Sequence, residues 1–187
     1  SMGYLALMPD LYTAGGTGRC LVGTMRAMRS GKGRAYLDIE AARQWLLNRD
    51  DGTGAVGILG FCMGGGFALM TAASGFDAAA VNYGMLPVDL EVTLENACPV
   101  VGSFGGKDGT LKGAADTLEL TLARKRIPHD VKEYPEAGHV FMNENLNGPA
   151  WIRPLVRVMN FGPNPEAAAD AWSRIDDFFS THLAASK

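Results

Sequence analysis

Residues 55–73 constrain the fold of this chain more than any other stretch. An apolar run at 55–59 leads into residues 60–65 (GFCMGG), and a helical run at 67–73 follows. This order predicts a buried strand, a sharp turn and a helix. A side chain at such a turn is exposed on a strained backbone, and the flanking glycines let the strand and the helix approach closely. Cys62 takes that position, where the N-terminal end of the following helix favours a thiolate.

The alternative for Cys62 is a small buried cysteine beside glycines that pack a helix. The pattern Gly-x-Cys-x-Gly is a weak signal by itself, because the chain has 24 glycines. A strand before it and a helix after it make it much stronger. We therefore treat Cys62 as a candidate nucleophile.

Composition favours one globular domain over residues 1–187, with 47% hydrophobic and 20% charged residues. A net charge of −3 and the lack of a Lys/Arg-rich run argue against a nucleic-acid partner. No apolar stretch reaches the roughly 18 residues of a membrane span, and no signal-peptide arrangement opens the chain. Cys20, Cys62 and Cys98 lack metal-ligand spacing, so we expect neither a metal or other cofactor nor a disulfide framework. A reducing cytoplasm suits such thiols.

Strands and helices alternate along the chain. The expected strands are 4–8, 55–59, 78–83, 99–104 and 130–134, and the expected helices are 20–29, 35–48, 67–73, 112–126 and one that begins at Pro165 after the cap Asn164. Residues 4–8 are continuously apolar, as in a strand buried on both faces, whereas 130–134 have the mixed polarity of a sheet edge. The alternation predicts an α/β fold with a mostly parallel sheet, helices on both faces and ligands at the carboxyl ends of the strands.

A nucleophile needs a base, and the base needs an acceptor that fixes its tautomer. His139 lies in the loop after the last strand, at the same sheet edge as Cys62, while His129 and His182 are expected at the surface. Asp108 follows the preceding strand, and the order nucleophile, acid, histidine is that of α/β-hydrolases. The alternatives are a loop histidine tied to a backbone carbonyl and an ordinary aspartate of a Gly-rich turn.

Several motifs together resemble the dienelactone hydrolase family. They are residues 3–12 (GYLALMPDLY), 60–65 (GFCMGG), 105–108 (GGKD) and 134–143 (YPEAGHVFMN), joined by residues 167–182. The resemblance runs through nearly the whole chain. It implies an α/β-hydrolase fold with Cys62, Asp108 and His139 as a triad, and hydrolysis of an ester or lactone such as a dienelactone.

The chain departs from the family in two places. Family members carry further strands and a helix before the Gly-Tyr strand, so the expected fold is N-terminally truncated and leaves the elbow strand with an open apolar edge. The same missing part supplies an oxyanion donor, which leaves the Met63 backbone N–H, and one lost donor typically costs about 10²–10³ in rate. Asn143 stands where dienelactone hydrolase has an arginine for the substrate carboxylate. That substitution weakens the case for a dienelactone itself.

The expected reaction begins when His139 takes the Cys62 proton and the thiolate attacks a carbonyl to form an acyl-enzyme, which water releases. Because a thiolate leaves a tetrahedral intermediate readily, small activated esters and enol-lactones are favoured over amides. Substrate contacts are expected from Arg26, Arg29, Tyr83, Phe141 and Asn143. Solvated surface arginines are the stronger alternative for the first two.

Two further interpretations stay open. The chain is either an enzyme or a truncated, weakly active module that acts through association, with its sheet edge covered in a homo-oligomer. A redox role for Cys62 is weaker, since no resolving cysteine is close in sequence. Residues 142–163, rich in Asn, Gly and Pro, leave directly from the His139 loop and are expected to cover the site.

Overall fold

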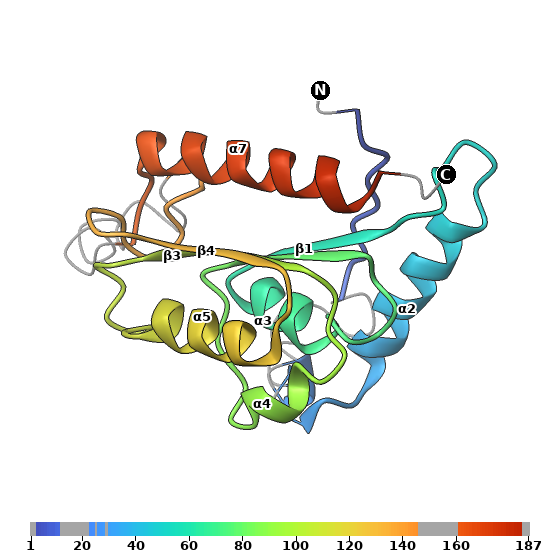
Figure 1. Cartoon of the computed structure of the whole chain (residues 1–187), viewed down its shortest axis with the longest axis horizontal. Helices are drawn as coiled ribbons and strands as arrows, with labels where there is room; N and C mark the ends of the chain where they lie inside the picture. The colour runs from blue at the N-terminus through green and yellow to red at the C-terminus, as the bar shows by residue number, and fades with distance from the viewer. Residues whose placement is uncertain (1–2, 12–22, 25, 29, 146–160, 185–187) are drawn as a thin grey trace.

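A four-stranded parallel sheet forms the centre of the protein, with the strand order β1-β2-β3-β4 (Figure 1). The computed structural model describes residues 3–11, 23–24, 26–28, 30–145 and 161–184. The strands are β1 (Gly57–Phe61), β2 (Ala78–Asn82), β3 (Val100–Gly105) and β4 (His129–Tyr134). The helices are α2 (Arg34–Leu47), α3 (Met63–Met70), α4 (Leu90–Thr93), α5 (Ala114–Lys125) and α7 (Pro165–His182). The predicted α/β class is confirmed.

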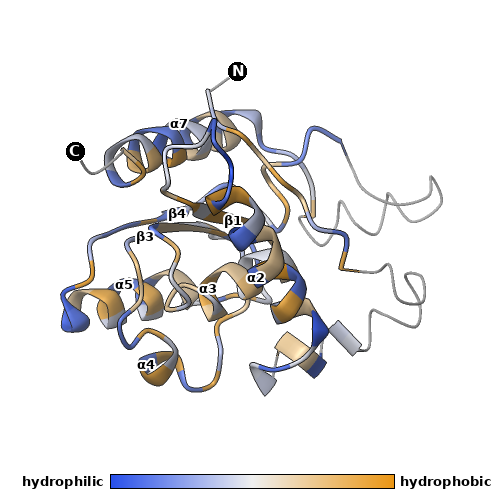
Figure 2. Ribbon diagram, turned by 90° about the vertical axis from the view of Figure 1, so that its right-hand side faces the viewer, coloured by the Kyte–Doolittle hydropathy of each residue, from blue (hydrophilic) through white to orange (hydrophobic). Residues whose placement is uncertain are grey.

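Helices cover both faces of the sheet, as the alternation of strands and helices predicts. Figure 2 shows α7 on one side and α3, α4 and α5 on the other. Along β2, Ala79 and Val81 pack into a core shared with α3 and α5, whereas Ala78 and Ala80 pack into a core shared with α7. Every residue of β2 and β3 is buried. Both faces of the central strands are therefore enclosed. A strand that is buried on both faces needs apolar residues at consecutive positions, which explains why these strands show no alternation of apolar and polar residues.

The terminal helix α7 has a strong start and one apolar side. The Asn164 side chain accepts a hydrogen bond from the Ala167 backbone N–H at 3.1 Å, and a proline occupies the first turn. Ala171, Ile175 and Phe179 recur every fourth residue and are buried against the sheet. The cap and the apolar stripe are the features from which the sequence predicts this helix, and that prediction is confirmed.

The strand predicted for residues 4–8 is wrong. The segment pairs with no strand of the described sheet, and Leu5 and Met8 are 50% and 92% exposed. Among the described residues, the segment contacts α7 through Tyr4. The Tyr4 hydroxyl donates to the Asp176 carbonyl, and the Tyr4 ring packs edge-on against Phe179. An apolar run becomes a buried strand only where neighbours cover its edges and both of its faces. Here α7 meets one side chain and the rest of the segment stays in solvent.

The remaining expectations need smaller corrections. The helix expected at 67–73 begins at Met63, directly after the turn. The short helix α4 is an element that the sequence analysis did not include, and its Glu91 forms an ion pair with Arg124 of α5. Of the helix expected at 20–29, residues 23–24 and 26–28 are helical and the others lie outside the described residues. Within the described ranges, each helix is too short or too polar to cross a lipid bilayer.

Candidate active site

Cys62 occupies the turn between β1 and α3, with backbone angles φ 53° and ψ −116°. A non-glycine residue in this region costs about 1–3 kcal/mol, so the surroundings must hold it there. The Cys62 N–H donates to the Asn82 carbonyl at 3.0 Å. A Cβ on Gly60 would lie 1.9 Å from the Gly64 carbonyl oxygen, and one on Gly65 would lie 2.7 Å from the Asn82 carbonyl oxygen. Gly60 and Gly65 of GFCMGG are thus required by close backbone approach, and Cys62 stays exposed.

Three side chains from three strand ends meet at this turn. The His139 Nε2 atom lies 3.1 Å from Cys62 Sγ, and its Nδ1 atom lies 2.5 Å from Asp108 Oδ2. Asp108 and His139 are 2% and 8% exposed. The structure therefore brings the three residues into one hydrogen-bonded chain at the carboxyl edge of the sheet. This arrangement suits proton transfer from a nucleophile to an oriented base.

Asp108 is oriented by a residue that sequence reasoning missed. The Thr110 hydroxyl donates to Asp108 Oδ1 at 2.6 Å, and the Thr110 backbone N–H donates to the same atom at 2.9 Å. Both contacts leave Oδ2 free for His139. The available signal was an aspartate followed two residues later by a hydroxyl residue in a Gly-rich turn, which is typical of an aspartate that caps its own turn.

The loops that carry Asp108 and His139 are locked together by their backbones. The Lys107 N–H donates to the Ala137 carbonyl at 2.9 Å, and a Cβ on Gly105 would lie 2.5 Å from the Gly138 carbonyl oxygen. This close approach fixes the separation of the acid and the base.

Hydrogen bonds within the triad shift the pKa values of Cys62, His139 and Asp108 away from their ordinary values. The hydrogen bond with His139 lowers the pKa of Cys62, helped by a hydrogen bond with the Met63 backbone and opposed by burial. Burial lowers the pKa of His139, but the hydrogen bonds with Asp108 and Cys62 outweigh it and raise that pKa to about 9. For Asp108, burial is outweighed by hydrogen bonds with His139 and Thr110, and its pKa is lowered. At neutral pH these shifts favour a thiolate beside an imidazolium.

The other predicted site residues lie at different distances from the triad. Tyr83 and Phe141 are buried against it, with the Tyr83 ring 5.3 Å from the His139 ring and 5.5 Å from the Phe141 ring. Asn143 is half-buried in the turn after His139, Arg26 is exposed, and Arg29 lies outside the described residues. Met63 opens α3, and the hydrogen bond of its backbone with Cys62 places it beside the sulfur.

The returning end of segment 142–163 reaches the base. The Phe161 ring lies 4.9 Å from the His139 ring, and the Gly162 N–H donates to the His139 carbonyl at 3.2 Å. Residues 146–160 lie outside the described residues, so covering of the site by this segment stays a prediction.

The remaining histidines are occupied elsewhere. His129 is half-buried and its Nε2 atom lies 3.2 Å from Glu119, while His182 is half-buried against Phe178. The expectation that both lie at the surface is therefore only partly right. In the described ranges, no group of three acidic, histidine or cysteine side chains is placed to hold a metal ion.

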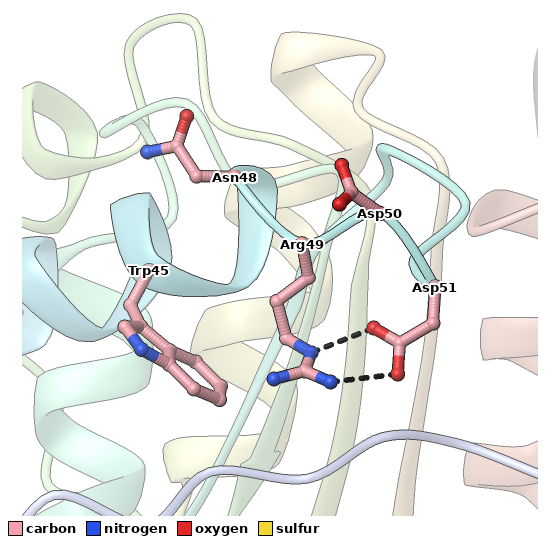
Figure 3. A pocket seen from close by; sticks show the side chains of 5 residues that line it. All are labelled: Trp45, Asn48, Arg49, Asp50 and Asp51. Atoms are coloured by element: carbon pink, nitrogen blue, oxygen red, sulfur yellow. Dashed lines mark hydrogen bonds and ion pairs between the residues drawn. The ribbon is translucent and has the colours of Figure 1, made fainter.

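A separate hollow of about 360 Å³ lies at the C-terminal end of α2 (Figure 3). It is lined by Trp45, Asn48, Arg49, Asp50 and Asp51. Arg49 donates to both carboxylate oxygens of Asp51, at 2.6 and 2.7 Å, and its guanidinium lies over the Trp45 ring. The chain passes from here into the amino end of β1, so the hollow and Cys62 belong to opposite ends of that strand.

A parallel sheet covered on both faces, with a strained strand-turn-helix at its carboxyl edge, defines a protein of the α/β-hydrolase type. Residues 1–183 match the model of the dienelactone hydrolase family. The chain belongs to that family.

Its relatives include proteins of the same type. The chain is 31% identical to a carboxymethylenebutenolidase of Rhodococcus opacus, over 79% of this chain and 58% of that protein. It is 29% identical to a carboxymethylenebutenolidase of Pseudomonas putida, over 78% of this chain and 66% of that protein. The structure of a dienelactone hydrolase-like promiscuous phosphotriesterase, P91, has a TM-score of 0.62 at 19% identity, over 97% of this chain and 72% of its own, which shows the shared fold. The chain thus spans less than two thirds of the length of the two named relatives.

Proposed function

We propose that this chain hydrolyses an activated ester or lactone through Cys62, His139 and Asp108, with an acyl-enzyme as intermediate. One observation carries the proposal: the unbroken contact chain from Cys62 Sγ through both ring nitrogens of His139 to Asp108, at 3.1 and 2.5 Å. Membership in a hydrolase family and relatives named carboxymethylenebutenolidase support the same reaction class.

In the proposed reaction the Cys62 thiolate forms a bond to the substrate's carbonyl carbon, and the carbonyl π electrons move onto oxygen. The Met63 backbone N–H donates a hydrogen bond to that oxygen. When the intermediate collapses, the bond to the leaving oxygen breaks and that oxygen takes the Nε2 proton of His139. Neutral His139 then removes a proton from water, which attacks the thioester and frees the acid.

The nucleophile restricts the substrate. A thiolate is a better leaving group than an alkoxide, so the intermediate returns to substrate unless the departing oxygen is also a good leaving group. Small enol-lactones and activated esters meet this condition and amides do not. Asn143, which has no charge for a substrate carboxylate, favours a neutral ester. We include a reducing compartment such as the cytoplasm in the proposal, because the reaction needs a free thiolate.

Hydrolysis of p-nitrophenyl acetate tests the proposal. Wild-type protein should release p-nitrophenolate and carry one acetyl group on Cys62 when the reaction is quenched early and measured by intact mass and peptide mapping. Cys62→Ala should lose both signals, while Cys98→Ala keeps them, since burial raises the pKa of Cys98 to about 12. Folded wild-type protein that neither turns over this ester nor acetylates Cys62 would contradict the proposal.

A further inference from the structure

Tyr83 has an unusual environment directly after β2. Its backbone has a positive φ of 40°, and its side chain is only 1% exposed. Its hydroxyl oxygen is buried and has no hydrogen-bond partner among the described residues. An unpaired buried hydroxyl costs about 1–3 kcal/mol, and a non-glycine residue at such a φ costs a similar amount. A phenylalanine would fill nearly the same space without the first cost.

Backbone contacts fix Tyr83 between the nucleophile and the base. The Tyr83 N–H donates to the Ser103 carbonyl at 2.7 Å on one side. On the other side, a Cβ on Gly65 would lie 2.9 Å from the Gly84 Cα atom. The backbone that follows Cys62 therefore packs closely against the residue after Tyr83. Above these contacts, the Tyr83 ring lies 5.3 Å from the His139 ring.

The hydroxyl also interacts electrostatically with the nucleophile. Burial raises the pKa of Tyr83, and the negative charge of Cys62 raises it further. The phenol therefore keeps its proton at neutral pH, which leaves its O–H available as a hydrogen-bond donor. The hydroxyl nevertheless makes no hydrogen bond to Cys62 or to any other described residue. Strain and unpaired polar groups of this kind gather at functional sites, where an incoming group completes them.

We propose that Tyr83 is a catalytic residue whose hydroxyl donates a hydrogen bond to the substrate's carbonyl oxygen as that oxygen becomes negative. This inference rests on the proposed function above. As Cys62 Sγ bonds to the carbonyl carbon and the π electrons move to oxygen, Tyr83 O–H and the Met63 backbone N–H both donate to that oxygen. No proton leaves Tyr83, and the His139 proton goes to the departing oxygen. Tyr83 thus supplies a second oxyanion donor from within this chain.

Two reactions of Cys62 distinguish a role of Tyr83 as an oxyanion donor from an effect of Tyr83 on the thiolate itself. Hydrolysis of p-nitrophenyl acetate forms an oxyanion, whereas alkylation by iodoacetamide needs the same thiolate and forms none. Tyr83→Phe should lower kcat by about 10²-fold with KM nearly unchanged, as expected for a lost oxyanion donor. Its rate of Cys62 alkylation should equal that of the wild type from pH 6 to 9. Urea unfolding should show equal or greater stability, because the substitution removes an unpaired buried hydroxyl.

Tyr36→Phe is the matched control. Its hydroxyl is also buried without a partner among the described residues, but its ring packs on Phe67 in α3 and not on the triad. This variant should keep wild-type kcat.

Each other result overturns the inference. An unchanged kcat in Tyr83→Phe would leave the hydroxyl without a catalytic role. Equal losses in hydrolysis and alkylation would show that it acts on the Cys62 and His139 pair instead of on the substrate. A clear loss of stability would show that the hydroxyl has a partner within the folded protein. Wild-type protein without turnover would instead reject the proposed function, before any Tyr83 variant is compared.

Discussion

At the scale of single residues, Cys62 and Cys98 show how surroundings shift the pKa of the same side chain in opposite directions. His139 lowers the pKa of Cys62, whereas burial raises the pKa of Cys98 to about 12. His139 in turn keeps its proton up to about pH 9. The two groups at the site titrate as a pair: the first proton lost comes from the thiol and the second from the imidazolium.

This coupling predicts the pH dependence of alkylation. A thiol whose pKa is lowered is deprotonated at lower pH, so Cys62 should react with iodoacetamide at pH 7, well below the ordinary thiol pKa of about 8.5. Cys98 should stay unmodified under the same conditions. Peptide mass spectrometry after timed quenching measures both sites separately. If the proposed reaction is right, hydrolysis should also decline above about pH 9, where His139 has lost the proton that it gives to the leaving group in that reaction.

His139→Ala is the control for this prediction. Without the imidazole, the alkylation profile of Cys62 should move up towards that of an ordinary thiol, near pH 8.5. A wild-type profile already centred there would show that no ion pair forms.

The positions of Cys62, Asp108 and His139 could be predicted because each lies in the turn or loop that follows a strand of one parallel sheet. The carboxyl ends of such strands share an edge, so sequence order alone brings the three residues together. The contribution of Thr110 needs the rotamer of Asp108, and that of Tyr83 needs the burial of a single oxygen atom. Neither property can be predicted from a repeating sequence pattern, because both arise from packing between loops.

At the scale of elements, the turn between β1 and α3 depends on how closely two backbones approach. Two of its glycines have opposite surroundings. A Cβ on Gly60 would meet the Gly64 carbonyl oxygen at 1.9 Å, whereas a Cβ on Gly64 would have nothing within 4 Å. Of these two glycines, the geometry requires Gly60 and tolerates the loss of Gly64.

Alanine substitutions test this difference. Gly60→Ala should destabilise the fold by about 3 kcal/mol or more, because the clash is with backbone that cannot rotate away. Gly64→Ala should be neutral or stabilise by up to about 1 kcal/mol, since alanine loses less entropy than glycine in a helix. Urea unfolding followed by circular dichroism measures both. Equal destabilisation by the two substitutions would contradict the close approach of the Gly60 and Gly64 backbones.

Element prediction succeeded where a signal was local and failed where it depended on neighbours. The cap Asn164 and the apolar spacing of α7 lie within one stretch of sequence, and they determine that helix. The apolar residues 4–8 carry an equally clear strand pattern, but a strand also needs a partner edge. Among the described residues, no strand pairs with the outer edge of β1 or with residues 4–8.

At the scale of the whole molecule, this outer edge of β1 is the surface that the expected homo-oligomer would cover. The structure describes a single chain, so that association stays a prediction, as does the alternative of a weakly active module. Light scattering coupled to size-exclusion chromatography measures the mass in solution.

Arg174 of α7 links that helix to the sheet through several polar contacts. Its guanidinium donates to the Gly102 carbonyl at 3.3 Å, to the Tyr134 hydroxyl at 3.2 Å and to the Asp130 carbonyl at 2.7 Å. It also forms an ion pair with the Asp130 carboxylate at 2.7 Å, and its side chain is 13% exposed. One side chain on α7 therefore pairs acceptors on both β3 and β4.

Replacing this arginine tests how strongly α7 is held. Arg174→Met keeps a long apolar side chain but leaves several half-buried acceptors unpaired, so we expect a loss of about 2–4 kcal/mol in urea unfolding. Arg124→Met is the control, because Arg124 is 65% exposed and pairs with Glu91, which is 55% exposed. An exposed pair contributes at most about 1 kcal/mol, and less in high salt. If both variants lost the same small amount, α7 would be held by its apolar face alone. A large difference would instead make the hydrogen bonds of Arg174 the link that keeps α7 packed behind Tyr83 and Phe141, and thereby keeps the candidate site in shape.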